Sequence, residues 1–276
     1  MIIGIGNITF GGTGKTIFVM EIVKRIKERV CVISRGYGGK REGKMSLVSD
    51  GTHIFYTPVE IGDEPYMLAK QLEGSIVITA IRREEAISYA RREFGVNIFI
   101  LDDSFQYRRL KKDINILMFN SDRPFFPPRD IPSRYETADL GIVVRREWVS
   151  PLIERIKIPI YYATIQPETE LEDKKVVAFC GIARPDSFKY TLKEAGCKVL
   201  RLLAFNDHHN YSLKDIRQTK EIKEEVGADK IVTTEKDFVK LPEKEGITPI
   251  RIRMIIEDGF WEDLSSLHPE IPIARK

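Results

Sequence analysis

The residues best suited to chemistry come first in the chain, in the glycine-rich stretch GIGNITFGGTGKT at positions 4–16. Its end, Gly14-Lys15-Thr16, matches the end of the phosphate-loop pattern G-x-x-x-x-G-K-[ST], although Thr9 stands where the first glycine belongs. Glycines let the backbone approach an anion closely, a lysine reaches the β- and γ-phosphates of a nucleotide, and a threonine hydroxyl binds Mg²⁺. The alternative is a glycine-rich turn without a ligand, but a strand, a loop and a helix follow in the required order. We therefore predict a nucleotide site formed by Thr9, Gly11, Gly12, Thr13, Gly14, Lys15 and Thr16.

Two adjacent aspartates, Asp102 and Asp103, follow an apolar run further along the chain. A carboxylate at the tip of a strand beside a phosphate loop is a common ligand of Mg²⁺. Neighbouring side chains of an extended segment point in opposite directions, so one aspartate can serve the metal and the other a different partner. The alternative is a pair of turn-forming aspartates that end a strand.

Two further segments are interpreted as helix starts when they are taken alone. In GDEP, at positions 62–65, Asp63 has the residue type of a helix N-cap, with Pro65 in the first turn. In VTTEKDFVKL, at positions 232–241, the threonines and acids can contact a ligand, yet they also make an ordinary capped helix start.

Two of the four histidines, His208 and His209, are adjacent in the segment FNDHHNY at positions 205–211. They fit a metal site, an acid–base pair or a surface loop. No cysteine or third ligand with zinc-like spacing lies nearby, which disfavours a structural metal. A histidine that titrates near neutral pH is suited to help deprotonate an attacking hydroxyl.

The elements that position these residues alternate along the chain. Apolar runs of five to seven residues alternate with amphipathic segments, a pattern typical of a mostly parallel sheet with helices on both faces. We expect one helix from Lys15 to about residue 29 and another that ends at Gly95. Ligands of such sheets bind at the carboxyl ends of the strands. The predicted fold is α/β, with a parallel sheet of the P-loop nucleoside triphosphate hydrolase type and a second, smaller α/β domain.

A change of composition suggests where the second domain begins. The proline-rich segment SDRPFFPPRDIPSR, at positions 121–134, is expected to be a loop, and strand and helix patterns resume after it. We predict a nucleotide-binding domain over residues 1–118 and a second α/β domain over residues 119–276 that completes an active-site cleft between the two.

Composition limits the class of protein. The chain of 276 residues is 42% hydrophobic and 31% charged, with a net charge of +3, and shows no concentrated basic stripe, so no nucleic-acid partner is expected. The cluster of Arg82 and Arg83 with Arg91 and Arg92 is interpreted as a solvated helix face. Three cysteines without CxxC spacing fit a reducing compartment. No stretch approaches the roughly 20 apolar residues of a membrane span.

Several segments, in this order and spacing, resemble one known family. The segments are GNITFGGTGKT, SRGYGG, GDEP, LDDSFQYRRL, FFPPRD, FCGIARPDSF, FNDHHNYS and VTTEKDFVKL, and they cover nearly the whole chain. Together they resemble the tetraacyldisaccharide 4′-kinases, the lipid A 4′-kinases of Gram-negative bacteria. The resemblance implies Mg²⁺-dependent transfer of the γ-phosphate of ATP to the 4′-hydroxyl of a lipid disaccharide 1-phosphate, with no stable protein partner.

The resemblance also gives the matching residues their roles. Asp63 matches the family's catalytic aspartate, and His208 matches the histidine that works with it as a dyad to deprotonate the sugar hydroxyl. His209 occupies a place where the family accepts histidine or tyrosine. The other matches are Lys15 and Thr16 as the phosphate-loop pair, Asp102 and Asp103 as acids beside the metal, Glu64 near the same metal, and Arg129 as an arginine that stabilises phosphate charge.

The chain departs from the family pattern in places. Ser104 stands where glycine is usual, Tyr107 where histidine is usual, and Ala183 where glycine or asparagine is common. The family normally has an apolar helix in the inner membrane before the phosphate loop, whereas three residues precede Gly4 here. We therefore expect peripheral attachment at the cytoplasmic face of the inner membrane, through surfaces such as RGYGGKR at positions 35–41.

Two other functions remain open from the residues alone. One is a small-molecule ligase or ATPase of the same nucleotide-binding group, similar to dethiobiotin synthetase, which needs no dyad. The other is a nucleotide-driven switch or metal-delivery protein with His208 and His209 as metal ligands. No guanine-binding NKxD sequence is present, which weakens the GTPase version of the switch.

Overall fold

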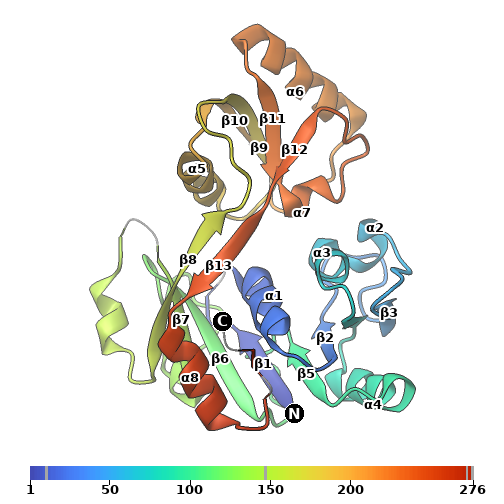
Figure 1. Cartoon of the computed structure of the whole chain (residues 1–276), viewed down its shortest axis with the longest axis vertical. Coiled ribbons are helices and arrows are strands. Elements are labelled where there is room, and N and C mark those ends of the chain that lie inside the picture. Colours follow the sequence, from blue (N-terminus) through green and yellow to red (C-terminus); the bar gives the residue numbers. More distant parts are fainter. Residues whose placement is uncertain (10–11, 146–147, 272, 275–276) are drawn as a thin grey trace. The chain divides into compact units, whose positions relative to one another are not determined.

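The computed structural model describes residues 1–9, 12–145, 148–271, 273 and 274. Within these ranges the chain forms two compact units, the larger comprising Met1–Thr164 with Met254–Lys276 and the smaller comprising Ile165–Arg253. Two strands carry the chain between them. β8 (Ile160–Pro167) leads out of the larger unit, and β13 (Ile252–Ile256) returns to it (Figure 1).

The larger unit is built on a sheet in the spatial order β13-β8-β7-β6-β1-β5-β2-β4-β3. Neighbouring strands from β8 across to β4 run parallel, and only the pairing of β3 with β4 is antiparallel among those with a described register. The strands not yet bounded are β1 (Ile2–Gly6), β2 (Val30–Ser34), β3 (Ser46–Ser49), β4 (Ile76–Thr79), β5 (Ile98–Leu101), β6 (Ile114–Asn120) and β7 (Leu140–Val144).

Helices cover both faces of this sheet, as the alternating sequence pattern predicts. On one face, alanines and an isoleucine of α4 pack against buried side chains of β2, β4 and β5. On the other, Phe18 of α1 meets Phe260 of α8 edge to face, with ring centroids 5.6 Å apart. The helices of this unit are α1 (Lys15–Arg25), α2 (Pro58–Ile61), α3 (Asp63–Gln71), α4 (Arg83–Phe94), α8 (Asp258–Leu267) and two short 3₁₀ turns at Pro132–Thr137 and Pro151–Arg155.

The two predicted helix ends have different outcomes. α4 ends at Gly95 as expected, because this glycine adopts the left-handed conformation (φ 66°) in which helices commonly terminate. α1 ends at Arg25, earlier than predicted, because Ile26 is extended and pairs with Ile273 in an isolated bridge. A contact with the far end of the chain therefore overrides the local helical pattern.

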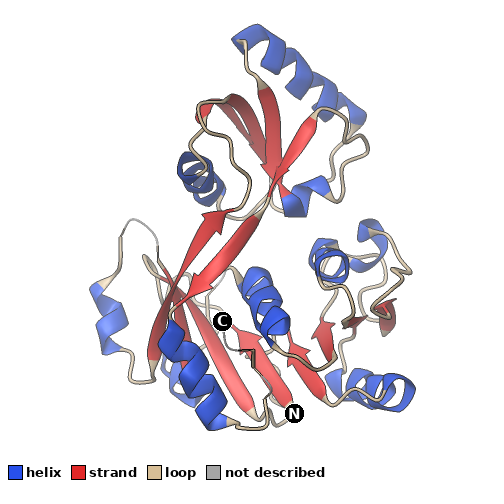
Figure 2. Cartoon of the chain, viewed as in Figure 1, coloured by secondary structure: helices blue, strands red, loops and turns tan. Residues whose placement is uncertain are grey.

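The smaller unit is a second α/β layer structure (Figure 2). Its sheet has the order β10-β9-β11-β12, and the three pairings are parallel. Phe188 and Leu192 of α5 pack on one side of the sheet, and Ile216 of α6 packs on the other with Phe179 and Tyr211. The elements are β9 (Lys175–Cys180), α5 (Pro185–Glu194), β10 (Lys198–Ala204), α6 (Leu213–Val226), β11 (Lys230–Thr234), α7 (Glu235–Phe238) and β12 (Ile247–Ile250).

The units divide at a different place from the predicted boundary between residues 118 and 119. β6 pairs with β1 on one side and with β7 on the other, in register Gly6↔Leu117 and Ile116↔Leu140. β6 therefore lies inside the nucleotide-binding sheet, and β7 and β8 extend it. The proline-rich segment at 121–134 is a connection within the larger unit.

Candidate active site

The carboxyl ends of β1, β2 and β5 bring the predicted phosphate loop and the two aspartates to one edge of the sheet. β5 lies between the other two strands in a parallel arrangement, so all three end on the same side. The turn after β5 is fixed by backbone bonds: the Asp102 amide donates to the Ile33 carbonyl (2.9 Å), and the Ser104 amide donates to the Ile5 carbonyl (2.9 Å).

The phosphate loop has the backbone expected for an anion site where it is described. Gly14 adopts φ 79°, a left-handed conformation that suits glycine, and α1 begins at the next residue, Lys15. The first helical hydrogen bond of α1 runs from the Phe18 amide to the Gly14 carbonyl, which leaves the amides before Phe18 available to an anion. Thr13 is buried and its hydroxyl accepts a hydrogen bond from Asn7 Nδ2 (3.3 Å). The predicted Gly11 lies outside the described residues.

Thr9, which replaces the first glycine of the pattern, is part of the folded loop. It is buried and forms an antiparallel bridge with Pro128 of the FFPPRD segment. Its Oγ1 has no hydrogen-bond partner within the described residues. A buried hydroxyl without a partner is the kind of group that a ligand satisfies.

Asp103 joins the loop, the acidic turn and the FFPPRD segment. Arg129 binds its carboxylate with two bonds of 2.7 Å, and Lys15 Nζ lies 3.3 Å from the same carboxylate. Arg129 also donates to Asn7 Oδ1 (3.4 Å), and its amide donates to the Ile8 carbonyl (2.7 Å). Burial raises the pKa of Asp103, but the hydrogen bonds and charges of Arg129 and Lys15 together hold it well below its usual range.

Asp102 has the opposite electrostatic environment. It is 1% exposed, and burial, followed by the negative charges of Glu64 and Asp103, raises its pKa to about 7, against the opposing charges of Lys15 and Arg83. Its Oδ1 has no hydrogen-bond partner among the described residues. A buried carboxylate oxygen without a partner, beside other acids, fits a hard cation such as Mg²⁺.

The carboxylates around Asp102 are suited to a metal ion that is also bound by phosphate oxygens. In the part of the chain that the structure describes, no group of three or more His, Cys, Asp or Glu side chains is arranged to hold a metal. Mg²⁺ is commonly held by one or two carboxylates plus phosphate oxygens and waters, so the arrangement around Asp102 fits it without a complete protein cage.

Arg83 is a buried residue of the candidate active site that the sequence did not predict. It was assigned to a solvated helix face, but it is 3% exposed, at the first position of α4, and its charge lowers the pKa of Asp102. Its guanidinium lies 5.5 Å from the centre of the Tyr107 ring, and its amide donates to the Tyr107 hydroxyl (3.3 Å). The available signal was its place shortly after β4, at the carboxyl edge of the same sheet.

The two unusual residues after Asp103 also stabilise this turn. The Ser104 hydroxyl is buried and donates to the Leu101 carbonyl (3.0 Å). The Tyr107 hydroxyl donates to Glu84 on α4. Where the family pattern has glycine and histidine, this chain therefore has side chains bonded to its own scaffold.

Asp63 and Glu64 open α3, which packs against α1. The N-cap is Gly62, so the interpretation of Asp63 as the cap is wrong: Asp63 is the first helical residue. Gly62 has φ 94°, and a Cβ there would lie 2.7 Å from the Tyr37 carbonyl oxygen, so this turn accepts only glycine. The segments RGYGG and GDEP are thereby in contact, and the charge of Glu64 raises the pKa of Asp102 and of Arg129.

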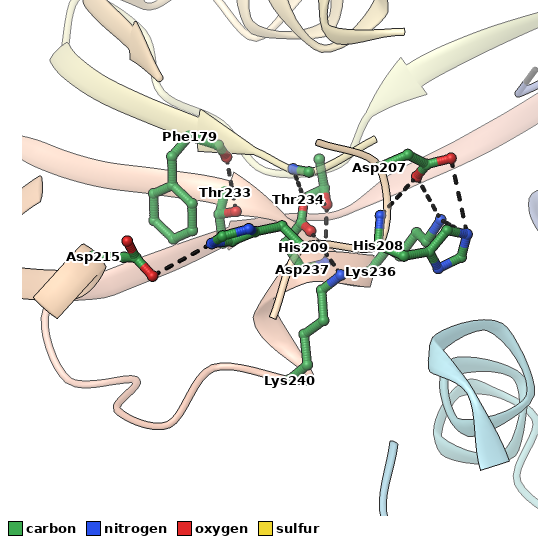
Figure 3. A network of polar contacts seen from close by, with 11 residues as sticks. Phe179, Asp207, His208, His209, Asp215, Thr233, Thr234, Lys236, Asp237 and Lys240 are labelled. Atoms are coloured by element: carbon green, nitrogen blue, oxygen red, sulfur yellow. Dashed lines mark hydrogen bonds and ion pairs between the residues drawn. The ribbon is translucent and has the colours of Figure 1, made fainter. Parts of the chain in front are cut away.

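The two adjacent histidines belong to the smaller unit and have different surroundings (Figure 3). The His209 ring stacks on Phe205, with centroids 4.6 Å apart, and its Nε2 lies 3.3 Å from Asp215 of α6. His208 turns away from this cluster, with its Nε2 3.3 Å from Lys236 Nζ and 3.8 Å from Asp207 Oδ2. Adjacent in sequence, the two rings do not share a metal site.

Comparisons with known proteins agree on one family. A sequence model described as tetraacyldisaccharide-1-P 4′-kinase matches residues 1–268. A tetraacyldisaccharide 4′-kinase of Syntrophus aciditrophicus is 34% identical over 88% of this chain and 76% of its own length. One of Halothermothrix orenii is 36% identical over 87% of this chain and 73% of its own length. The crystal structure of the "apo" form of LpxK from Aquifex aeolicus in complex with ATP superposes with a TM-score of 0.75 and 26% identity, over 98% of this chain and 88% of that one.

Proposed function

This chain belongs to the tetraacyldisaccharide-1-P 4′-kinase family, and we propose that it transfers the γ-phosphate of ATP to the 4′-hydroxyl of a tetraacyldisaccharide 1-phosphate in lipid A biosynthesis. It is a kinase that uses ATP with Mg²⁺, and the fold is of the P-loop type, as predicted. The observation that carries the proposal is the phosphate loop joined to Asp103 and Arg129 in a chain that matches the family over residues 1–268. The ligase and metal-delivery alternatives are not favoured.

On the phosphate side, the chain's contribution is charge and positioning. The amides at the start of α1 and the Lys15 ammonium bind the phosphates, and Arg129 stabilises the charge of the group being transferred. Asp103 keeps Lys15 and Arg129 in fixed places before the substrate arrives, which lowers the reorganisation needed for reaction. Asp102, Thr16 and Glu64 would hold Mg²⁺, which neutralises phosphate charge when bound.

On the acceptor side, the reaction needs a base. Asp63 is at the first turn of a helix that packs against α1, the helix that carries Lys15. In the proposed mechanism Asp63 accepts the proton of the 4′-hydroxyl, and His208 supports it as the second member of a dyad. The dyad requires that Asp63 of the larger unit and His208 of the smaller unit act on one substrate.

The acceptor is a lipid, and a surface of the larger unit suits its location. Five large apolar side chains between residues 35 and 60 are 38–63% exposed: Tyr37, Met45, Ile54, Phe55 and Val59. Lys40 and Lys44 are exposed within the same stretch, and the Lys40 amide donates to the Val59 carbonyl (3.1 Å), which joins the two halves of the surface. Apolar side chains beside lysines fit an anionic membrane surface, here the cytoplasmic face of the inner membrane.

Peripheral attachment is tested by flotation with anionic vesicles. In the residues described, no helix has both the length and the apolar character needed to cross a membrane. Phe55→Ser with Val59→Ser, and separately Lys40→Glu with Lys44→Glu, should each weaken flotation. Arg41 is a poorer choice, because its guanidinium contacts Ser46 and the Tyr56 ring. Leu213→Ser, at an exposed leucine of the smaller unit, is the matched control. Flotation unchanged by both double variants would disprove the assigned surface.

The reaction is tested by transfer of label from γ-³²P-ATP to a detergent-dispersed disaccharide 1-phosphate. Wild type should label the lipid, and Asp63→Ala and His208→Ala should each lower the rate by roughly two orders of magnitude. His209→Phe is the control for His208, since it leaves the neighbouring ring stack in place. Hydrolysis of ATP without labelled lipid would instead support the ligase or ATPase alternative.

A further inference from the structure

The segment VTTEKDFVKL does more than start a helix. The predicted cap is present, because Thr234 Oγ1 accepts a hydrogen bond from the Asp237 amide (3.1 Å) at the start of α7. Yet Asp237 is fully buried and Lys240 nearly so, with Lys240 Nζ 3.3 Å from Asp237 Oδ1. A buried ion pair is not needed to start a helix of four residues, so another role must account for these side chains.

Asp237 fixes the end of β9 and, through it, the histidine loop. Its Oδ2 accepts hydrogen bonds from the Gly181 amide (2.9 Å) and from Thr234 Oγ1 (2.7 Å). The Gly181 carbonyl in turn accepts from the His208 amide (3.2 Å). A chain of hydrogen bonds therefore connects α7 to the backbone of His208.

The backbone of His208 needs such support. Its φ of 59° lies in the left-handed region, which is uncommon for a residue with a side chain. A residue held in that conformation persists where its surroundings fix it, and such positions cluster at functional sites. The hydrogen bond to Gly181 supplies that restraint on the backbone.

Lys236 then acts on the imidazole itself. Its side chain is 17% exposed, and its Nζ lies 3.3 Å from His208 Nε2 and 3.3 Å from Asp207 Oδ1 (Figure 3). An ammonium has three donors and no acceptor. Because an ammonium can only donate, the contact with Nε2 is a hydrogen bond that Nε2 accepts, and the proton of the neutral ring is on Nδ1.

We propose that Lys236 is a positioning residue that fixes His208 in the Nδ1–H tautomer, on a loop that Asp237 and Lys240 hold in place. If His208 supports the base Asp63 as proposed above, Nδ1 is then the protonated nitrogen of its neutral ring. This consequence for catalysis rests on the proposed function, whereas the tautomer itself does not.

Nitrogen-15 NMR of the full chain tests the tautomer directly. Long-range ¹H–¹⁵N spectra are recorded at a pH where the ring signals no longer change, and the His208 signals are identified by their loss in His208→Gln. We expect a pyridine-like Nε2 and a pyrrole-like Nδ1 in wild type and in Lys236→Arg, because arginine is also only a donor. In Lys236→Met the proton should shift toward Nε2. Lys214→Met, at an exposed lysine of α6, is the matched control, and its His208 signals should be the same as those of wild type. A protonated Nε2 in neutral wild type, or a spectrum that Lys236→Met does not change, would overturn the proposal.

Transfer kinetics separate this proposal from the proposed function. Lys236→Met should lower kcat roughly tenfold with little change in the KM for ATP, and Lys236→Arg should restore most of the rate. Absence of lipid labelling by wild type, with the expected spectra, would reject the kinase function and leave the tautomer in place. A changed spectrum with full transfer by Lys236→Met would reject the role of the tautomer in catalysis.

Discussion

The phosphate region of the larger unit and the histidine region of the smaller unit hold their charged groups in different ways. In the larger unit, Asp103 binds Arg129 and Lys15, which are 26 and 88 positions away in the sequence, and Asp102 is 1% exposed. In the smaller unit, the His208 side chain is 31% exposed and its partners Asp207 and Lys236 lie on a loop and a short helix. In the first region, burial and ion pairs together therefore set the charge of each aspartate. In the second, contacts with Asp207 and Lys236 orient one partly exposed ring.

Within the larger unit, the two adjacent aspartates differ strongly in acidity. Asp103 has two cations within hydrogen-bond distance, which keep it charged although it is largely buried. Asp102 has no such partner in the described residues and faces other acids, so its charged form is costly until a cation arrives. In the phosphate region, Asp103 is therefore already paired with two cations, whereas the Asp102 carboxyl is suited to bind a further cation.

The largest effect is expected from Lys15→Met. Lys15 ends the phosphate-loop pattern, and its ammonium also lies 3.3 Å from Asp103. Its loss should lower the rate of phosphoryl transfer by roughly three orders of magnitude, because positioning and charge stabilisation provide most of the catalysis in this class of reaction. Rates are measured with labelled ATP and the disaccharide acceptor.

Lys24→Met is the matched control for Lys15→Met. Lys24 is on the same helix, half exposed and paired with Glu21. It should leave transfer within about twofold of wild type, since surface ion pairs contribute little. Equal loss in both variants would mean that the helix, and not the Lys15 ammonium, is responsible.

Asp102→Asn should separate stability from activity. The pKa of Asp102 in the folded chain, about 7, lies above the usual aspartate value of about 3.9, so the folded chain keeps a proton that the unfolded chain has lost. Stability is therefore lost as pH rises from about 4 to about 7, and asparagine removes this loss. Without Mg²⁺, the variant should be more stable than wild type by a few kcal/mol at about pH 8, while transfer falls roughly a hundredfold.

The measurement for Asp102→Asn is urea unfolding at two pH values without metal. The advantage of the variant should be larger at about pH 8 than at about pH 5.5, because only part of the loss of wild-type stability has accumulated at the lower pH. An advantage that does not depend on pH would show that it does not come from the charge of Asp102.

Arg129→Lys should have a smaller effect that tests geometry alone. Lysine keeps the charge but cannot make the two parallel bonds of 2.7 Å to Asp103. We expect roughly tenfold slower transfer, and a larger loss in Arg129→Met, which removes the charge as well. Equal rates for wild type and Arg129→Lys would show that the two parallel hydrogen bonds from Arg129 are not needed to position Asp103.

The sequence predicted the parts of the site that local patterns define. The strand, loop and helix around Lys15, and the acids at the end of β5, were predicted because the carboxyl ends of parallel strands lie at one edge. The helix start at Thr234 was also predicted and is confirmed. The family resemblance added the kinase function, which the comparisons confirm.

What the sequence did not predict depends on contacts between distant segments. Arg83 was placed on a solvated face because a charged residue at a helix start is usually exposed. Its burial depends on distant residues, since the charge of Asp102 and the Tyr107 ring act on its guanidinium. The unit boundary was misplaced because nothing local in β6 indicates that it pairs with both β1 and β7. The contact between Lys236 and His208 likewise spans 28 positions.

The smallest effect is expected from His209→Phe, which tests whether adjacent histidines are independent. Phenylalanine can keep the stack on Phe205, and Asp215 retains its bonds of 2.8 Å from the amide and hydroxyl of Ser212. Loss of the partly exposed contact between His209 and Asp215 should cost at most about 1 kcal/mol in urea unfolding. Transfer should stay within about twofold of wild type, against a roughly hundredfold loss in His208→Ala. A comparable loss in both variants would mean that the loop acts as one unit, and that the smaller region depends on its packing as strongly as the larger one does.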